Sequence, residues 1–177
     1  MNTAQVVEYI KTKIGKAVIS ETDFCGEMTL EIRKEHVKEV LTLLKMIPAL
    51  GYTVLMDLTA VDYLTPIKQT KVVYWLHNPN NLQRLRVVTF VERDGALPSV
   101  TPLWEGANWY EREVFDLFGV SFEGHPDLKR LLMPDDWKGH PLRRDYALTE
   151  EPVQFKHNVR PKVPSEIIPY VKSHEKS

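Results

Sequence analysis

Cysteine is nearly absent from this chain of 177 residues, which contains only Cys25. One thiol cannot close an intrachain disulfide, so a disulfide-stapled secreted scaffold is excluded. The chain also cannot supply the four thiolates of a typical iron–sulfur cluster, or a cysteine-rich zinc site. If the protein takes part in electron transfer, we therefore expect the redox centre to lie in another chain.

An excess of one charge sign is also missing, because 23 lysines and arginines nearly balance 24 acidic residues, for a formal net charge of -1. Nucleic-acid-binding proteins usually carry a strong basic excess, so we expect no nucleic-acid partner. The longest apolar runs, around residues 40–50 and 53–61, are interrupted by charged residues or proline and fall short of the ~20 residues that span a bilayer. No secretory signal precedes them. We expect a soluble intracellular chain that meets the membrane only through partners.

Glycine is scarce as well, with eight in the chain and none clustered. The chain has no Gly-x-Ser-x-Gly elbow, no phosphate-binding loop of the Gly-x-x-x-x-Gly-Lys-Ser/Thr type and no Gly-x-Gly-x-x-Gly fingerprint. A nucleotide cradled by backbone amides is therefore not expected.

The apolar pattern that is present predicts an α+β fold. Helical spacing covers about residues 2–13, where Asn2 or Thr3 can cap the helix, and residues 34–47, where Pro48 ends it. Strands are expected at residues 17–20, 28–32, 52–61, 71–77 and 82–92, with a hairpin turn at residues 78–81. The order αββαβββ predicts a mainly antiparallel sheet with helices on one face.

The composition changes near Pro98, since nine of the 12 prolines lie from there onward. One further helix is expected at residues 106–118, closed by Gly119, and the chain beyond it should be extended. Its large apolar side chains need a surface to bury against, either their own domain's or a partner's. From Glu151 the proline- and lysine-rich composition predicts polyproline II structure or disorder. We therefore expect an α+β domain over residues 1–120 and an extended partner-binding arm over residues 121–177.

Charged residues are dense on the last predicted helix. Arg112 and Asp116 are spaced i, i+4, and Arg112 follows Trp109 by three residues, a pattern typical of a solvated ion-pair face. Glu111, Glu113 and Asp116 could also be read as an acid/base set. That chemistry needs a cleft and a shifted pKa, and the sequence indicates neither.

Two histidines and two arginines allow further interpretations. His125 and His140, with the neighbouring aspartates, could form a metal site, but their spacing matches no established ligand pattern. The Gly-His-Pro triplets are more typical of tight turns in which the imidazole bonds a backbone group. Arg143 and Arg144 suit either bidentate capture of a partner's carboxylates or plain solvent exposure.

Residues 105–148 closely resemble the pattern of the 30 kDa subunit of respiratory complex I, the subunit designated C in bacterial NADH-quinone oxidoreductase. Lys129 departs from the pattern by replacing the usual arginine, which keeps the charge. The matching residues are Glu111-Arg112-Glu113, Asp116-Leu117-Phe118-Gly119, Phe122, Gly124-His125-Pro126-Asp127-Leu128, Arg130, Leu132, Pro134, Asp136-Trp137, Gly139, Pro141-Leu142-Arg143 and Asp145-Tyr146.

The resemblance implies a non-catalytic subunit in the peripheral arm of a proton-translocating NADH-quinone oxidoreductase, on the cytoplasmic side of the bacterial inner membrane. This chain would hold no cofactor or metal. FMN and iron–sulfur clusters would carry electrons from NADH to quinone in partner subunits, which include a 49 kDa-type subunit and cluster-bearing neighbours. The residues expected to anchor the interface or brace the arm are Glu111, Arg112, Asp116, Gly119, His125, Arg130, Asp136, Trp137, Gly139, Pro141, Arg143 and Asp145.

Two alternatives remain open at this stage. The chain could be the homologous subunit of a ferredoxin-plastoquinone oxidoreductase or of an energy-converting hydrogenase. In a different class, it could be a stand-alone acid/base or metal-dependent hydrolase that uses His125 and His140.

Overall fold

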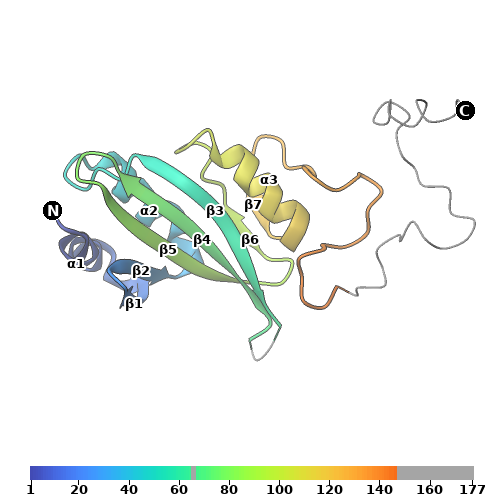
Figure 1. Ribbon diagram of the computed structural model, residues 1–177, viewed down its shortest axis with the longest axis horizontal. Coiled ribbons are helices and arrows are strands. Elements are labelled where there is room, and N and C mark those ends of the chain that lie inside the picture. Colours follow the sequence, from blue (N-terminus) through green and yellow to red (C-terminus); the bar gives the residue numbers. More distant parts are fainter. Residues whose placement is uncertain (65–66, 147–177) are drawn as a thin grey trace, which may run out of the picture. The chain divides into compact units, whose positions relative to one another are not determined.

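The computed structural model describes residues 1–64 and 67–146. Met1–Tyr146 form one compact unit (Figure 1). The boundary expected after residue 120 falls inside this unit, so residues 121–146 fold with the domain that precedes them. The polyproline II structure or disorder predicted from Glu151 onward lies outside the described residues.

The unit is built on a five-stranded sheet with the strand order β1-β2-β5-β4-β3. β2 and β5 are parallel, and the other neighbours are antiparallel, which confirms the mainly antiparallel sheet. The strands are β1 (Val18–Phe24), β2 (Glu27–Ile32), β3 (Val54–Tyr63), β4 (Gln69–Asn78) and β5 (Gln83–Glu92).

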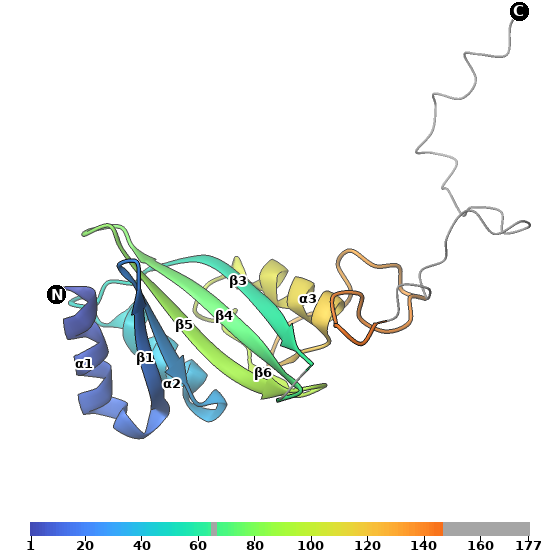
Figure 2. The same cartoon turned by 60° about the horizontal axis from the view of Figure 1, so that its bottom comes forward.

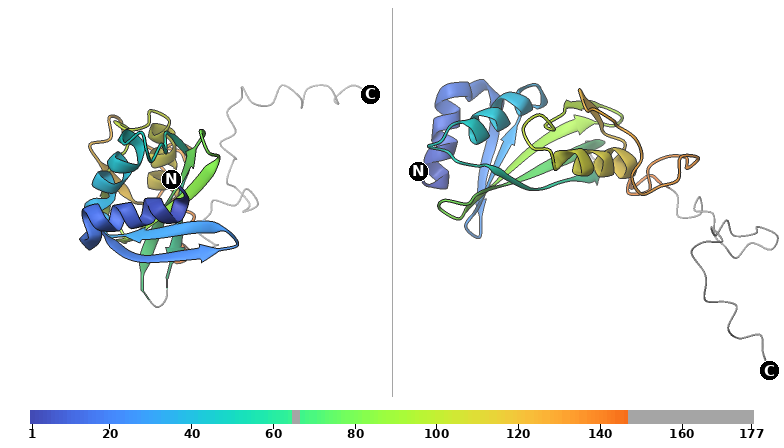
Figure 3. Two further views of the ribbon diagram at one scale, coloured as in Figure 1. Left: turned by 90° about the vertical axis from the view of Figure 1, so that its left-hand side faces the viewer. Right: turned by 90° about the horizontal axis from the view of Figure 1, so that it is seen from above.

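Helices cover one face of this sheet, as the views in Figures 2 and 3 show. They are α1 (Thr3–Ile14), α2 (Val37–Met46) and α3 (Ala107–Phe118), with short 3-10 turns at Gly15–Ala17 and Lys34–His36. Within the described ranges, no helix has both the length and the apolar character needed to cross a bilayer.

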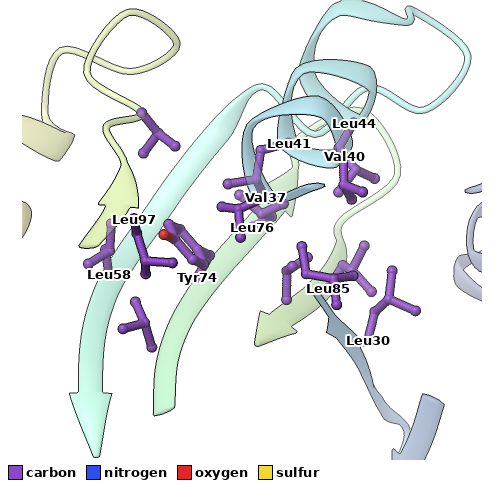
Figure 4. Packing of buried hydrophobic residues seen from close by; sticks show 14 of the residues in the cluster. Leu30, Val37, Val40, Leu41, Leu44, Leu58, Tyr74, Leu76, Leu85 and Leu97 are labelled. Atoms are coloured by element: carbon purple, nitrogen blue, oxygen red, sulfur yellow. The ribbon is translucent and has the colours of Figure 1, made fainter. Parts of the chain in front are cut away.

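The core lies between the helices and the inward-facing strand residues. Leu76 and Leu85 pack beneath α2, and Tyr74 lies beside Leu58 and Leu97 (Figure 4). These side chains are essentially inaccessible to solvent. Fully burying one leucine stabilises a fold by ~1.5–3 kcal/mol, so this layer is the main source of stability.

The helix ends follow from local chemistry. Asn2 caps α1 as expected, because its side chain accepts the Gln5 N–H at 2.8 Å while the Gln5 side chain accepts the Asn2 N–H at 2.9 Å. α3 ends where Gly119 adopts a left-handed conformation with φ of 77°, as predicted.

A second, two-stranded sheet was not predicted. β6 (Ala96–Pro98) and β7 (Ser121–Glu123) pair in parallel, and β7 carries the core residue Phe122. At three residues each, these strands are too short to show an alternating pattern. The pairing returns the chain to the domain directly after α3, and so determines where the following residues begin.

Candidate functional site

Residues 124–146 follow β7 without helix or strand; they pass beside α3 and loop out beyond its carboxyl end (Figure 1). We call residues 124–146 the α3-bound segment. Hydrogen bonds to α3 and to the turn after β5 hold it in place. The residues singled out by the sequence are concentrated in this contact.

Asp116 is the centre of the contact. It lies on α3, and its side chain is 0% exposed. Its Oδ2 accepts three successive backbone N–H groups, those of Leu131 at 3.0 Å, Leu132 at 2.7 Å and Met133 at 2.9 Å. Burial alone would raise the pKa of Asp116, but these amides and Arg130 outweigh burial and lower it. Asp116 is therefore held as a carboxylate that fixes the backbone of the segment.

Arg130 completes the buried ion pair. Its Nη1 donates to Asp116 Oδ1 at 2.7 Å, and its Nη2 donates to the carbonyl oxygens of Trp137 and Gly139, each at 3.1 Å. One guanidinium thus links α3 to two later points of the segment. The forked geometry of arginine suits this arrangement, which a lysine ammonium cannot reproduce.

Arg112 does not form the expected ion pair with Asp116. Its Nε donates to the Lys129 carbonyl at 3.1 Å and its Nη2 to the Arg130 carbonyl at 3.0 Å, while its guanidinium lies 5.1 Å from the Trp109 ring centre. The prediction of a solvated ion-pair face was therefore wrong for this side of α3. The Lys129 and Arg130 carbonyls, which belong to an irregular part of the chain, accept the hydrogen bonds of Arg112 in place of Asp116.

The segment also caps the carboxyl end of α3, where the last carbonyl groups of a helix have no partner within the helix. His140 Nδ1 lies 2.8 Å from the Asp116 carbonyl, the Leu142 N–H donates to Leu117 at 3.1 Å, and Arg143 Nε donates to Phe118 at 2.6 Å. A positive side chain at this end also interacts favourably with the helix dipole.

Gly119 is required where these groups meet. At its φ of 77°, a Cβ atom would be strained, and it would lie 2.6 Å from His140 Cδ2 and collide with the Arg143 guanidinium. Arg143 Nη2 in turn donates to Asp94 Oδ1 at 2.6 Å, which ties the segment to the turn after β5. The pairing with Arg143 lowers the pKa of Asp94.

A second ionic contact holds the end of the segment, and only one of its residues, Asp145, was predicted from the sequence. Asp145, which was predicted, pairs with Arg93, and Arg93 Nη2 donates to the buried Asp62 at 2.6 Å. The Arg144 N–H also donates to Asp62, at 2.9 Å. One signal was available, because Asp62 follows Leu58 and Ala60 at inward-facing positions of β3, where a charge is unexpected.

Glu111 is 0% exposed and lies on the opposite side of α3 from the solvent. Its Oε2 accepts the Ser99 hydroxyl and its Oε1 accepts the Val100 N–H, both at 2.7 Å. Burial raises the pKa of Glu111 to about 7, although both hydrogen bonds oppose the shift. Glu111 thus fastens the turn after β6 to α3, and sequence reasoning gave no sign of Ser99.

The two histidines bond backbone groups, as the turn interpretation expected. His125 Nδ1 accepts the Asp127 N–H at 3.0 Å, so Nε2 carries the proton and donates to the Asn108 carbonyl at 3.2 Å. Among residues 1–64 and 67–146, no group of three or more His, Cys, Asp or Glu side chains is placed to hold a metal ion. The hydrolase interpretation therefore gains no support from His125 and His140.

The remaining predicted residues lie within the segment. Asp136 is exposed, Pro141 is half-buried, and Gly139 has a φ of 80° with Tyr146 packed over it. Large apolar side chains nevertheless stay in solvent on α3 and the segment, namely Trp109 (59% exposed), Leu132 (62%) and Leu142 (51%).

Comparison with known proteins identifies the family to which the chain is similar. Residues 30–152 match the family model described as respiratory-chain NADH dehydrogenase, 30 Kd subunit. The NADH-quinone oxidoreductase subunit designated C in Roseiflexus sp. (strain RS-1) is 40% identical over 89% of this chain and 91% of its own length. The subunit of the same designation in Citrifermentans bemidjiense is 44% identical over 83% of this chain and 90% of its own length.

A mitochondrial subunit and a chain of known structure match as well. The mitochondrial NADH-ubiquinone oxidoreductase 30.4 kDa subunit of Neurospora crassa is 46% identical over 70% of this chain and 44% of its own length. A chain of the membrane-bound sulfane sulfur reductase, an archaeal respiratory membrane complex, superposes with a TM-score of 0.69 at 25% identity, covering 82% of this chain and 85% of that one.

The fold is thus that of a protein found in respiratory membrane complexes with several subunits. The chain belongs to the family of 30 kDa subunits of respiratory-chain NADH dehydrogenase. The resemblance seen in residues 105–148 is confirmed.

Proposed function

We propose that this chain is a non-catalytic structural subunit in the peripheral arm of a proton-translocating NADH-quinone oxidoreductase. Its α3-bound segment would dock on the 49 kDa-type subunit and on cluster-bearing neighbours. FMN and iron–sulfur clusters would be held by those partners, and the chain would meet the cytoplasmic side of the membrane only through the complex.

One observation carries the docking role. The α3-bound segment is irregular, yet Asp116, Arg130, Arg112 and Arg143 fix its backbone within a single compact unit. A segment that is already ordered avoids much of the entropy cost of becoming ordered on binding. It presents apolar side chains to solvent beside α3, which is typical of protein–protein interfaces.

The way the polar groups are engaged supports the structural role. Asp116 is a buried carboxylate saturated by four donors from residues 130–133, and Glu111 faces the protein interior. A general acid or base needs a free position within hydrogen-bond reach of a substrate. The charges of this site instead fix the shape of the segment.

A second candidate keeps the architecture and changes the electron donor. The similarity to a chain of the sulfane sulfur reductase supports this candidate, because the name of that respiratory complex, unlike the names of the other relatives, does not include NADH. The chain would then serve a ferredoxin-plastoquinone oxidoreductase or an energy-converting hydrogenase.

Affinity purification of the tagged chain from its native membranes in mild detergent tests both candidates. Mass spectrometry would identify the partners, and an NADH-quinone assay would identify the donor. Leu132→Glu places a charge on the proposed interface, whereas Leu82→Glu is a matched control at the β4–β5 turn, where the leucine is 77% exposed.

We expect the wild type and Leu82→Glu to recover 49 kDa-type and cluster-bearing subunits with NADH oxidation, and Leu132→Glu to lose most of them. The same partners without NADH oxidation or flavin subunits would favour the second candidate. Equal recovery with Leu132→Glu would refute docking through this surface. A lone monomer with bound metal would return attention to His125 and His140.

A further inference from the structure

Glu111 has a hydrogen-bonded route to the surface, although its carboxyl group is inaccessible to solvent. Its Oε2 lies 2.7 Å from the Ser99 hydroxyl, which lies 2.8 Å from the Thr101 hydroxyl. Thr101 is partly exposed. Two hydroxyl groups in series therefore connect the interior carboxyl group with a residue that is partly exposed to solvent.

We propose that Glu111 is a proton-binding site of this protein, and that the hydroxyls of Ser99 and Thr101 form the path by which its proton exchanges with solvent. Proton binding at Glu111 involves only residues inside the compact unit, so it does not depend on the docking role.

The chain of hydroxyls is complete in both protonation states. With Glu111 ionised, Ser99 donates to the carboxylate and accepts from the Thr101 hydroxyl and from the Thr101 N–H, which lies 3.2 Å away. With Glu111 protonated, the carboxyl group donates to Ser99 and Ser99 donates to Thr101. A hydroxyl group can exchange these roles by rotating, so neither state leaves a broken link.

Proton transfer balances along this path. A hydronium ion gives a proton to Thr101, which passes its own proton to Ser99, and Ser99 passes its own to Glu111 Oε2. The products are a carboxylic acid and a water molecule, and both hydroxyl groups are restored. Meanwhile the Val100 N–H keeps the second oxygen, Oε1, in place at 2.7 Å.

The surroundings leave the carboxyl group free to titrate. Tyr74 of β4 interacts electrostatically with Glu111, and its buried hydroxyl group has no hydrogen-bond partner among the described residues. Burial and the nearby Glu111 both raise the pKa of Tyr74, so it stays neutral. On α3, Arg112 donates to carbonyl groups and Asp116 pairs with Arg130, so neither neutralises Glu111.

Proton binding at this position acts on a junction of the fold. Glu111 joins α3 to the turn after β6, and the opposite side of the same helix holds the α3-bound segment through Asp116. Ionisation puts an uncompensated charge into this junction, and proton uptake removes it. The site therefore links the electrostatics beneath α3 to pH near neutrality.

Carbon-13 NMR of the full chain, labelled at glutamate carboxyl groups, tests the proposal. We expect one glutamate to titrate more than one pH unit above the others, in fast exchange, and to vanish in Glu111→Gln. Ser99→Ala removes a donor from the carboxylate and should raise that midpoint by about one unit. This shift would also assign the signal if Glu111→Gln did not fold.

Thr101→Val tests the path itself. It should slow the exchange between the two forms by about tenfold or more, seen as broadened or separate signals, because the proton then needs local opening of the fold. Thr22→Val, an exposed threonine on β1, is the matched control and should exchange like the wild type. A Glu111 signal that titrates with the other glutamates would overturn the site, and unchanged exchange in both Thr101→Val and Ser99→Ala would overturn the path.

Discussion

Replacing Asp116 by alanine should unfold the contact between α3 and its segment. The change removes the acceptor of three backbone N–H groups and leaves the Arg130 guanidinium, whose side chain is 18% exposed, without its carboxylate. Removing one partner of a buried ion pair typically costs about 3–5 kcal/mol. The amides add little beyond this figure, because the released segment can hydrate them.

The expected loss is therefore about 3–5 kcal/mol, a large share of the 5–15 kcal/mol that stabilises a typical domain. Urea unfolding at neutral pH, followed by circular dichroism, measures it. Asp127→Ala is the control in the same segment, because Asp127 and its partner Lys129 are exposed, and it should leave the urea midpoint nearly unchanged.

The pH dependence has a defined sign. The pKa of Asp116 is lower in the folded state, so its stabilisation is fully present above the unfolded value of about 3.9 and is lost as pH falls through the folded value. The difference between wild type and Asp116→Ala should therefore shrink below about pH 4. A loss below about 1 kcal/mol at neutral pH, or one equal to that of Asp127→Ala, would refute the central role of Asp116.

Two further variants, and a third that serves as a glycine control, test other contacts. Folding raises the pKa of Glu111 from 4.5 to about 7, so the unfolded chain releases this proton first as pH rises, and the free energy of unfolding should fall by about 3 kcal/mol between those pH values. Urea unfolding across this pH range should show the fall in the wild type and not in Glu111→Gln. A parallel pH profile for the two proteins would contradict this expectation. Gly119→Ala should lower stability by about 1–3 kcal/mol through strain and displacement of Arg143. Gly15→Ala, with a φ of -55° and open space, should be neutral or stabilising by up to about 1 kcal/mol, and similar melting temperatures for both glycine variants would contradict the packing argument.

The main elements of the fold were predictable because their signals are local. Apolar spacing located the three helices and five long strands, and Asn2 and Gly119 marked two helix ends. Pairings between distant short segments carry no such signal, which is why β6 and β7 were missed. The strand β1 also runs on to Phe24, past the predicted end at residue 20, because it pairs with β2 across a hairpin.

The sequence predicted which residues form the candidate site better than it predicted the contacts between them. Asp116 finds its partners in residues 130–133, and spacing along one helix favoured Arg112 instead. Either Arg112 or Arg130 could neutralise Asp116, and only the path of the chain between β7 and residue 130 determines which of them does. The burial of Glu111 likewise depends on tertiary structure, because it is set by where the turn after β6 crosses α3.

The central claim is that the α3-bound segment is folded onto α3 by Asp116 before any partner binds. Amide hydrogen exchange of the isolated full chain tests it at the N–H groups of Leu131, Leu132 and Met133, which Asp116 accepts. The account predicts slow exchange of all three in the wild type and fast exchange in Asp116→Ala. Exchange as fast as in an unstructured peptide, with protection gained only inside the complex, would show that the partner orders the segment and would contradict the account.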